Sequence, residues 1–463
     1  MPALRRGSSD SEAAVGAFRT AAFVIVAAGC TFVPWIFTTR IDDVFYLPKL
    51  VALWVLLGAV LWLLALSAVK GESTARIRLI RLIDLPVLAF VAFTLLAFAL
   101  SEDKHQSLFG EQLQHQGVLT TLLYVAFFYV GRVLVCTKHR LRLLFGASAV
   151  GATGVSAYAI VQKLGLDPIW KGYLPSGRVF STIGQPNALA AYLLIAIPVT
   201  AALALGQKQG VRIAALASLA SMVVALLLTY SRAGYLGLVT AGAVFVYGCR
   251  GRTTLARPVP RIYAGGVIVA LLLTLAIVGP VRGVVTSTWH RAWSVSSVNN
   301  DESISAHLDL WKVAVRIIEG HPVVGTGPET FPEVFPTYSR MVLPASTVRD
   351  LDQYRVESPH NEVLAIASGA GVPTALFYLI FLAGAAAVLW RVARNDADSA
   401  VRVAMVAVLA VEAGHFVTDS FMSAEVTGSW LFWTLIGAAL GVTSASSAQR
   451  TAADASFGSD SGA

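Results

Sequence analysis

The chain has 463 residues, of which 56% are apolar and only 13% are charged, and its formal net charge at pH 7 is +8. Soluble proteins carry about 25% charged residues, so this composition excludes a soluble enzyme, a disordered scaffold and a nucleic-acid-binding protein. Charge-free runs such as 51–69 and 262–278 can cross a hydrocarbon core about 30 Å thick as helices. We therefore predict an all-α polytopic membrane protein in contact with membrane lipids and without a nucleic-acid partner.

Twelve membrane-spanning helices are predicted. They lie near 18–38, 46–69, 84–100, 117–136, 143–163, 187–206, 211–229, 233–249, 262–280, 362–390, 401–420 and 426–443. The first nine spans occupy 18–280, the last three occupy 362–443, and one long loop, 281–361, separates them. The two tails, 1–17 and 444–463, are rich in Ser, Ala and Gly and are predicted to be disordered.

Lys and Arg are distributed unevenly between the two sets of short loops. With the N-terminus inside, the inner loops hold about three times as many of these residues as the short outer loops do. By the positive-inside rule, both tails are predicted to be cytoplasmic and loop 281–361 to lie outside. The expected location is the cytoplasmic (inner) membrane, with any active site on its outer face.

The long outer loop contains one amphipathic segment, His307–Glu319. Its predicted apolar face carries Leu308, Trp311, Val315 and Ile318, and its polar face carries Asp309, Lys312, Arg316 and Glu319. Such a helix would lie against the outer leaflet or cap the bundle.

Arg232 is an informative cation because it lies in a tight outer turn, Thr229-Tyr-Ser-Arg-Ala-Gly-Tyr235, between two predicted spans. Placing Arg in hydrocarbon costs roughly 2.5–3.5 kcal/mol on insertion scales. One interpretation is an arginine that snorkels to the interface. The functional interpretation is an anion clamp, because the planar guanidinium offers paired donors that match phosphate oxygens.

Three further outer-face residues are candidates. His360, in Ser358-Pro-His-Asn-Glu362, has a side chain suited to proton transfer near neutral pH, although a His at a loop–helix junction also serves as a cap or a structural hydrogen-bonding group. Arg178 lies before the turn-forming pair Pro186-Asn187 and is either an anion-binding group or an ordinary loop charge. Lys49, which follows Pro48, is the weakest of the three.

No metal or cofactor is predicted, because the sequence has no His-x-x-x-His pair and no phosphate-binding glycine loop placed on a strand–helix unit. Arginines and histidines at an outer face suit a reaction that expels a diphosphate from a lipid-borne donor. The arginines would hold the leaving group, and a histidine would accept the proton of the acceptor hydroxyl.

Ordered short motifs in the chain resemble those of the O-antigen ligase and polymerase superfamily. They are Arg178–Leu193 with its Pro-Asn-x-Leu-Ala core, Tyr230-Ser-Arg-Ala-Gly234, Leu308-x-x-Trp311 with His321-Pro-Val-Val-Gly-Thr-Gly327 and Phe331, and His360-Asn-Glu-Val-Leu364 with Gly369-Ala-Gly-Val-Pro373. The resemblance extends from Arg178 to about Leu382. It implies a bundle like that of the lipid-dependent glycosyltransferases. It also implies metal-independent, inverting transfer of a glycan from an undecaprenyl-diphosphate carrier to a lipid, glycan or protein acceptor.

The resemblance also implies residue roles. Arg232 would bind the diphosphate, and His360 would act as the base or bind the acceptor. The superfamily usually carries Arg just before the Leu-x-x-Trp stretch, where this chain has His307. Either His307 makes that contact in its protonated form, or another loop cation does, with Arg291 between Trp289 and Trp293 as the substitute. The predicted catalytic residues are His360 and Arg232, and the predicted substrate-binding residues are Arg178, Arg291, His307, Asn361 and Lys49.

Several functions share these features. The compact outer loop favours a ligase, whereas a polysaccharide polymerase or a protein O-oligosaccharyltransferase would carry the same motifs and use a different acceptor. A membrane transporter is a different class of protein. It would need polar residues at mid-membrane, and the predicted spans are largely free of charges.

Overall fold

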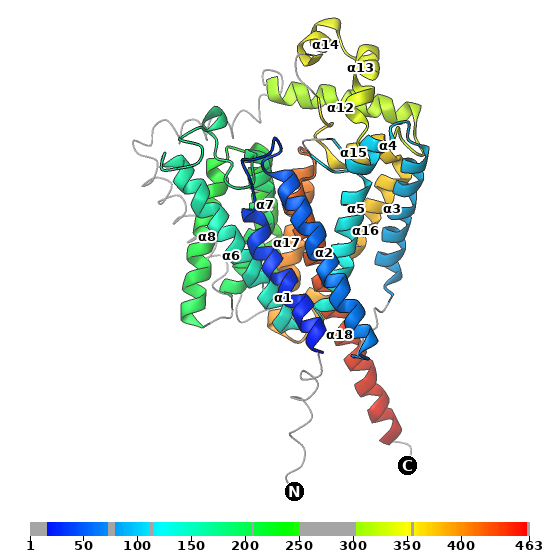
Figure 1. Ribbon diagram of the computed structural model, residues 1–463. Helices are drawn as coiled ribbons and strands as arrows, with labels where there is room; N and C mark the ends of the chain where they lie inside the picture. The colour runs from blue at the N-terminus through cyan, green and yellow to red at the C-terminus, as the bar shows by residue number, and fades with distance from the viewer. Residues whose placement is uncertain are drawn as a thin grey trace.

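The structure, a computed structural model, describes residues 16–72, 79–111, 114–205, 208–250, 302–352 and 356–460, and it contains helices and no strand within them. Nine of the described helices are long and apolar enough to cross a membrane. Figure 1 shows them as an upright bundle with a group of smaller helices above it. The prediction of an all-α polytopic membrane protein is confirmed.

The bundle is built from helices that correspond to most of the predicted spans. They are α1 (Ala17–Phe32, extended by the short helix η1, Val33–Trp35), α2 (Tyr46–Val69), α3 (Arg81–Leu100), α5 (Val118–Leu134), α6 (Lys138–Lys163), α7 (Pro186–Ala204), α8 (Gln209–Leu228), α9 (Arg232–Cys249), α16 (Val372–Asn395), α17 (Ser399–Asp419) and α18 (Val426–Asp460). Two short helices lie in connections, α4 (Lys104–Phe109) and η2 (Pro175–Gly177). The predicted span 262–280 lies outside the described residues.

The predicted continuous span 362–390 is wrong. It consists of two helices, α15 (Glu362–Ala370) and α16, that are separated at Gly371. Gly371 has φ +89°, a conformation that a side chain disfavours, and a Cβ there would lie 2.0 Å from the carbonyl oxygen of Val323. The chain turns at this point, so α15 lies above the span formed by α16.

Two of the glycine-rich motifs form one joint in the structure. The backbone N–H of Gly327 donates to the carbonyl of Gly369 at 2.8 Å, and the N–H of Val372 donates to the carbonyl of Pro322 at 2.9 Å. The segment that follows α12 is therefore bonded directly to the α15–α16 turn.

Above the bundle, α12 (Glu302–Gly320), α13 (Phe331–Val342) and α14 (Ala345–Asp352) form a group that we call the cap (Figure 1). The cap has its own apolar core, made of Leu310, Val313, Ala314, Ile317, Phe331, Phe335, Leu343 and Val348. The amphipathic helix is therefore present and longer than predicted.

The face of that helix that packs in the cap is not the predicted apolar face but the one beside it. Leu308 and Val315 are 41% and 45% exposed, whereas Val313 and Ile317 are fully buried. Apolar residues occupy two adjacent faces of α12, and α13 and α14 pack against only one of them. Spacing alone therefore could not identify the buried face.

The start of α1 and the end of α18 lie at the end of the bundle opposite the cap (Figure 1). The first part of α18, Val426–Thr443, is buried inside the bundle. The helix then continues to Asp460, although 444–463 were predicted to be disordered. The alanines of this segment favour helix, which explains why the backbone stays helical beyond the bundle.

Candidate functional site

A cavity of about 400 Å³ lies where α12 meets the N-terminal ends of α2 and α7 and the segments that precede α15 and α18. We call it the histidine cavity. Its lining residues are Tyr46, Gln114, Gly184, Gln185, Asn187, His307, Glu357, His360, Phe421, Met422, Ser423, Ala424 and Glu425. It brings together two of the predicted site residues, His307 and His360, which are far apart in the sequence.

The two histidine rings contact each other edge to face, with their centroids 5.6 Å apart and an interplanar angle of 87°. His360 has φ +49°, which is rare for a residue with a side chain. Its ring Nδ1 lies 3.4 Å from the Ser358 hydroxyl, which also accepts the backbone N–H of His360 at 3.2 Å. Ser358 in turn shares a hydrogen bond with the Ser423 hydroxyl. Ser358 therefore fixes both the backbone and the ring of His360.

Both histidines are disposed to be neutral. Burial lowers the pKa of His360 below its ordinary value of 6.5. Burial and then the neighbouring charge of His360 lower the pKa of His307. Nδ1 of His307 is buried and has no hydrogen-bond partner among the described residues. The two rings therefore disfavour being positively charged at the same time. Nδ1 of His307 also remains able to form a hydrogen bond with a ligand.

Two carboxylates lie on other walls of the cavity. Glu357 accepts a hydrogen bond from the Gln114 amide at 2.9 Å. Glu425 precedes α18 and accepts the backbone N–H groups of Thr427 at 2.8 Å and Gly428 at 2.5 Å. Burial raises the pKa of Glu425 to about 7, even though these N–H groups and the Lys49 charge act in the opposite direction. These groups favour hydroxyl-bearing ligands on their side of the cavity and disfavour anions.

Lys49 is completely buried. Its ammonium donates to the carbonyl of Phe45 at 2.9 Å and to the carbonyl of Thr182 at 2.8 Å. Gly184 and Gln185, which follow Thr182, line the cavity, whereas Lys49 does not. Lys49 therefore holds a segment of the cavity wall in position.

Arg178 contacts the segment that joins α8 to α9, where Arg232 also lies. The Arg178 guanidinium donates to the carbonyl of Thr229 at 2.7 Å and to the side-chain oxygen of Asn187 at 2.5 Å. Arg232 comes three residues after Thr229 and begins α9, where Ser231 caps the helix by accepting the N–H of Gly234. Asn187 lines the histidine cavity and neither arginine does, so Asn187 connects Arg178 to the cavity.

Asn361 caps α15 and is already engaged by the protein. Its side-chain oxygen accepts the N–H of Leu364 at 3.0 Å, and its amide donates to the carbonyl of Ser420 at 3.0 Å. It therefore fixes the segment that follows His360. The remaining predicted binding residue, Arg291, lies outside the described residues.

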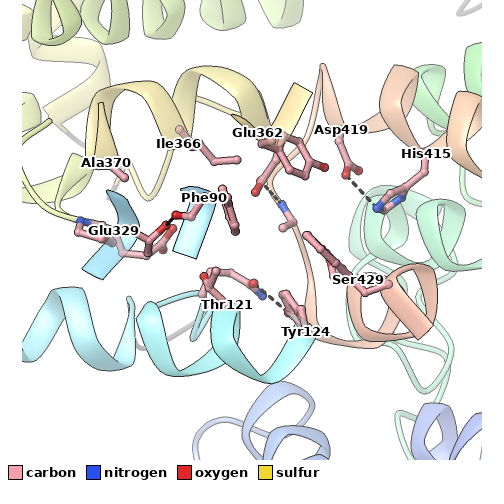
Figure 2. A pocket seen from close by; sticks show the side chains of 17 residues that line it. Phe90, Thr121, Tyr124, Glu329, Glu362, Ile366, Ala370, His415, Asp419 and Ser429 are labelled. Atoms are coloured by element: carbon pink, nitrogen blue, oxygen red, sulfur yellow. Dashed lines mark hydrogen bonds and ion pairs between the residues drawn. The ribbon is translucent and has the colours of Figure 1, made fainter. Parts of the chain in front are cut away.

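A second cavity of about 80 Å³ lies deeper in the bundle, and sequence reasoning did not find it. Figure 2 shows its acidic groups Glu329, Glu362 and Asp419, together with His415. One sequence signal was available, because Glu412, His415 and Asp419 follow i, i+3, i+7 spacing within an apolar span and are all buried. The expectation that the spans are largely free of charges is therefore wrong for α17.

The comparison with protein families supports a function for the part of the chain that holds the two histidines. Residues 217–379 match the family described as O-antigen ligase. The match covers less than half of the chain, and it includes Arg232, His307 and His360. No curated protein matches the chain significantly. The match confirms the resemblance to the O-antigen ligase superfamily and indicates a membrane glycosyltransferase that acts in polysaccharide biosynthesis.

Proposed function

Starting from this family match, we propose that the chain transfers a glycan from an undecaprenyl-diphosphate carrier to an acceptor hydroxyl on the outer face of the cytoplasmic membrane. The observation that carries the proposal is the histidine cavity, in which His360 and His307 lie together. Asn187, in the wall of the same cavity, accepts a hydrogen bond from Arg178. Its volume of about 400 Å³ is in the range of pockets that enclose small organic ligands.

In this proposal the diphosphate lies toward the arginines. Arg232 and Arg178 would neutralise the charge that develops on the diphosphate as the glycosidic C–O bond breaks. His307 would donate to a phosphate oxygen once it is protonated, with Arg291 as the alternative cation. Lys49 and Asn361 would contribute to substrate binding through the backbone segments that they hold.

His360 would act as the general base. If its Nδ1 donates to the Ser358 hydroxyl, its Nε2 carries the lone pair that accepts the proton of the acceptor hydroxyl. The acceptor oxygen then forms a bond with the anomeric carbon from the side opposite the diphosphate, and the electron pair of the broken bond leaves with the diphosphate. This attack inverts the anomeric configuration, and the histidine, the arginines and the substrate supply all the groups that it uses.

The acceptor distinguishes the related activities. A lipid acceptor would make the chain a ligase, a growing glycan would make it a polymerase, and a protein hydroxyl would make it an O-oligosaccharyltransferase. The small outer cap favours the ligase.

Deletion of this protein is expected to cause the lipid-linked glycan to accumulate. Purified protein should convert that donor into undecaprenyl diphosphate and an acceptor-linked glycan of inverted anomeric configuration. Mass spectrometry of the lipid fraction and NMR of the product would measure both. Glycan that crosses the membrane still attached to its carrier would contradict the proposal and support a transporter.

The proposed orientation, with both ends cytoplasmic, is tested by cysteine labelling. Ser346 in the cap and Ala397 between α16 and α17 are exposed. In a variant whose three native cysteines are replaced, S346C should react with a membrane-impermeant maleimide in spheroplasts. A397C should react only after permeabilisation. The reverse pattern would place the histidine cavity on the cytoplasmic side and contradict the proposed outer-face reaction.

A further inference from the structure

The deeper cavity combines carboxyl groups with aromatic rings. Glu329 comes from the α12–α13 connection and Glu362 from α15, and Figure 2 shows both among the residues around the cavity. Tyr378 and Trp433 also line it, with their ring centroids 6.3 Å apart. No Lys or Arg is among its described lining residues. This lining is unsuited to a diphosphate and suited to an uncharged ligand with many hydroxyl groups.

The polar groups of this cavity offer both donors and acceptors. Burial raises the pKa of Glu329 to about 8, with the negative charges of Glu362 and Glu111 acting in the same direction, so Glu329 is protonated at neutral pH and can donate. Burial also raises the pKa of Glu362, whose carboxyl group accepts the N–H of Ala424 at 3.0 Å.

His415 is a further polar group of this cavity. His415 is 4% exposed, and its Nε2 pairs with Asp419 at 3.0 Å. Its Nδ1 is buried without a hydrogen-bond partner in the part of the chain that the structure describes. A buried polar atom normally finds a partner, so this nitrogen points to a ligand that supplies one.

The two cavities are neighbours. Ala424 lines both of them, and Glu362 of the deeper cavity comes two residues after His360 of the histidine cavity. A ligand in the deeper cavity would therefore be separated from the proposed base, His360, only by the start of α15 and the Ala424 segment.

We propose that the deeper cavity is a subsite for an uncharged sugar ring. The ring would exchange hydrogen bonds with Glu329 and Glu362 and pack a face against Trp433 or Tyr378. The sugar belongs to one of the two glycans that the reaction joins, the donor or the acceptor. This inference rests on the proposed function for its role in the reaction, whereas sugar binding itself requires no catalysis.

The direct test measures the binding of methyl glycosides to the purified full-length protein by the change in tryptophan fluorescence. The glycosides are those of glucose, galactose, mannose and N-acetylglucosamine. At least one glycoside should bind saturably. T121L places a larger side chain on the cavity wall and should weaken that binding about tenfold or more. The matched control is T240L on α9, because the hydroxyls of Thr121 and Thr240 both bond the carbonyl four residues earlier. T240L should bind as the wild type does.

E329M provides a second variant if T121L does not fold, because it retains the approximate length of the side chain and removes both its hydrogen-bond donor and its acceptors. It should weaken the same binding. Any one of three results would overturn the proposal. The first is that no glycoside binds saturably, the second is that T240L weakens binding as much as T121L does, and the third is that inorganic pyrophosphate displaces the glycoside. None of these outcomes depends on turnover, so they are separable from failure of the proposed transferase activity.

The transfer assay then identifies the source of the sugar. An increase in the KM of T121L for the acceptor alone would place the acceptor glycan in the subsite. An increase in the KM for the lipid-linked donor alone would place the donor glycan there. Unchanged values of both KM would overturn the role of the subsite in the reaction, even if methyl glycosides bind.

Discussion

R232K is expected to lose about 30- to 1,000-fold in transfer rate while the protein inserts and folds normally. The lysine keeps the charge and loses the planar pair of donors that matches two phosphate oxygens. Loss of one such contact in the transition state costs roughly 2–4 kcal/mol, which gives this range of rates. Initial rates with purified protein and lipid-linked donor would measure the effect.

The control is R340K on the exposed side of α13, which makes the same substitution in the cap and should leave the rate unchanged. If R232K transfers glycan at the wild-type rate, Arg232 does not bind the diphosphate and is an interfacial, snorkelling side chain instead.

H360A is expected to abolish transfer and to leave donor binding largely intact, because it removes the proposed base and no proposed diphosphate contact. H307A should instead weaken donor binding. H307R restores the cation that the superfamily usually has at this position, so it should keep or raise activity. Rates and donor affinities of the purified variants would separate the two roles.

The pH dependence follows from the same assignment. A base works in its neutral form, and burial lowers the pKa of His360, so the rate should be constant above neutrality and fall with a midpoint below pH 6.5. A phosphate-binding histidine works in its protonated form, so donor affinity should weaken as the pH rises through the pKa of His307. H307R should remove that loss. Transfer by H360A, or an inactive but folded H307R, would show that the two roles are wrongly assigned.

The fold was predictable where it follows from long apolar runs. The limits of α2 agree with the predicted span 46–69 because Lys70 ends the apolar run sharply. The break at Gly371 was not predictable from hydropathy, because the residues on both sides are apolar. It follows from the left-handed conformation and the close approach of Val323, and only the folded backbone shows these.

The candidate site was predictable as a set of residue types, but its geometry was not. The motifs identified His360 and His307 separately, and no sequence pattern indicates that their rings are in contact. Glu357 and Glu425 resemble ordinary loop residues in the sequence and become part of the cavity only through folding. For Asn361 and Lys49, the sequence could not show that their polar groups already bond the backbone.

The segment between α12 and α15 is bonded to the rest of the protein at two points, which matters for engineering. Gly327 is bonded to Gly369, and Ser358 is bonded to Ser423, so α13 and α14 lie on a stretch of chain whose ends are both anchored to the body of the protein. The entropy cost of a longer closed loop grows slowly, by about 0.6 kcal/mol for each doubling of its length. An insertion after Pro344, which is exposed between α13 and α14, would therefore leave the membrane helices and the His360 segment in place. Acceptors of very different size could be accommodated by grafting new recognition modules at this position, with the reaction centre unchanged.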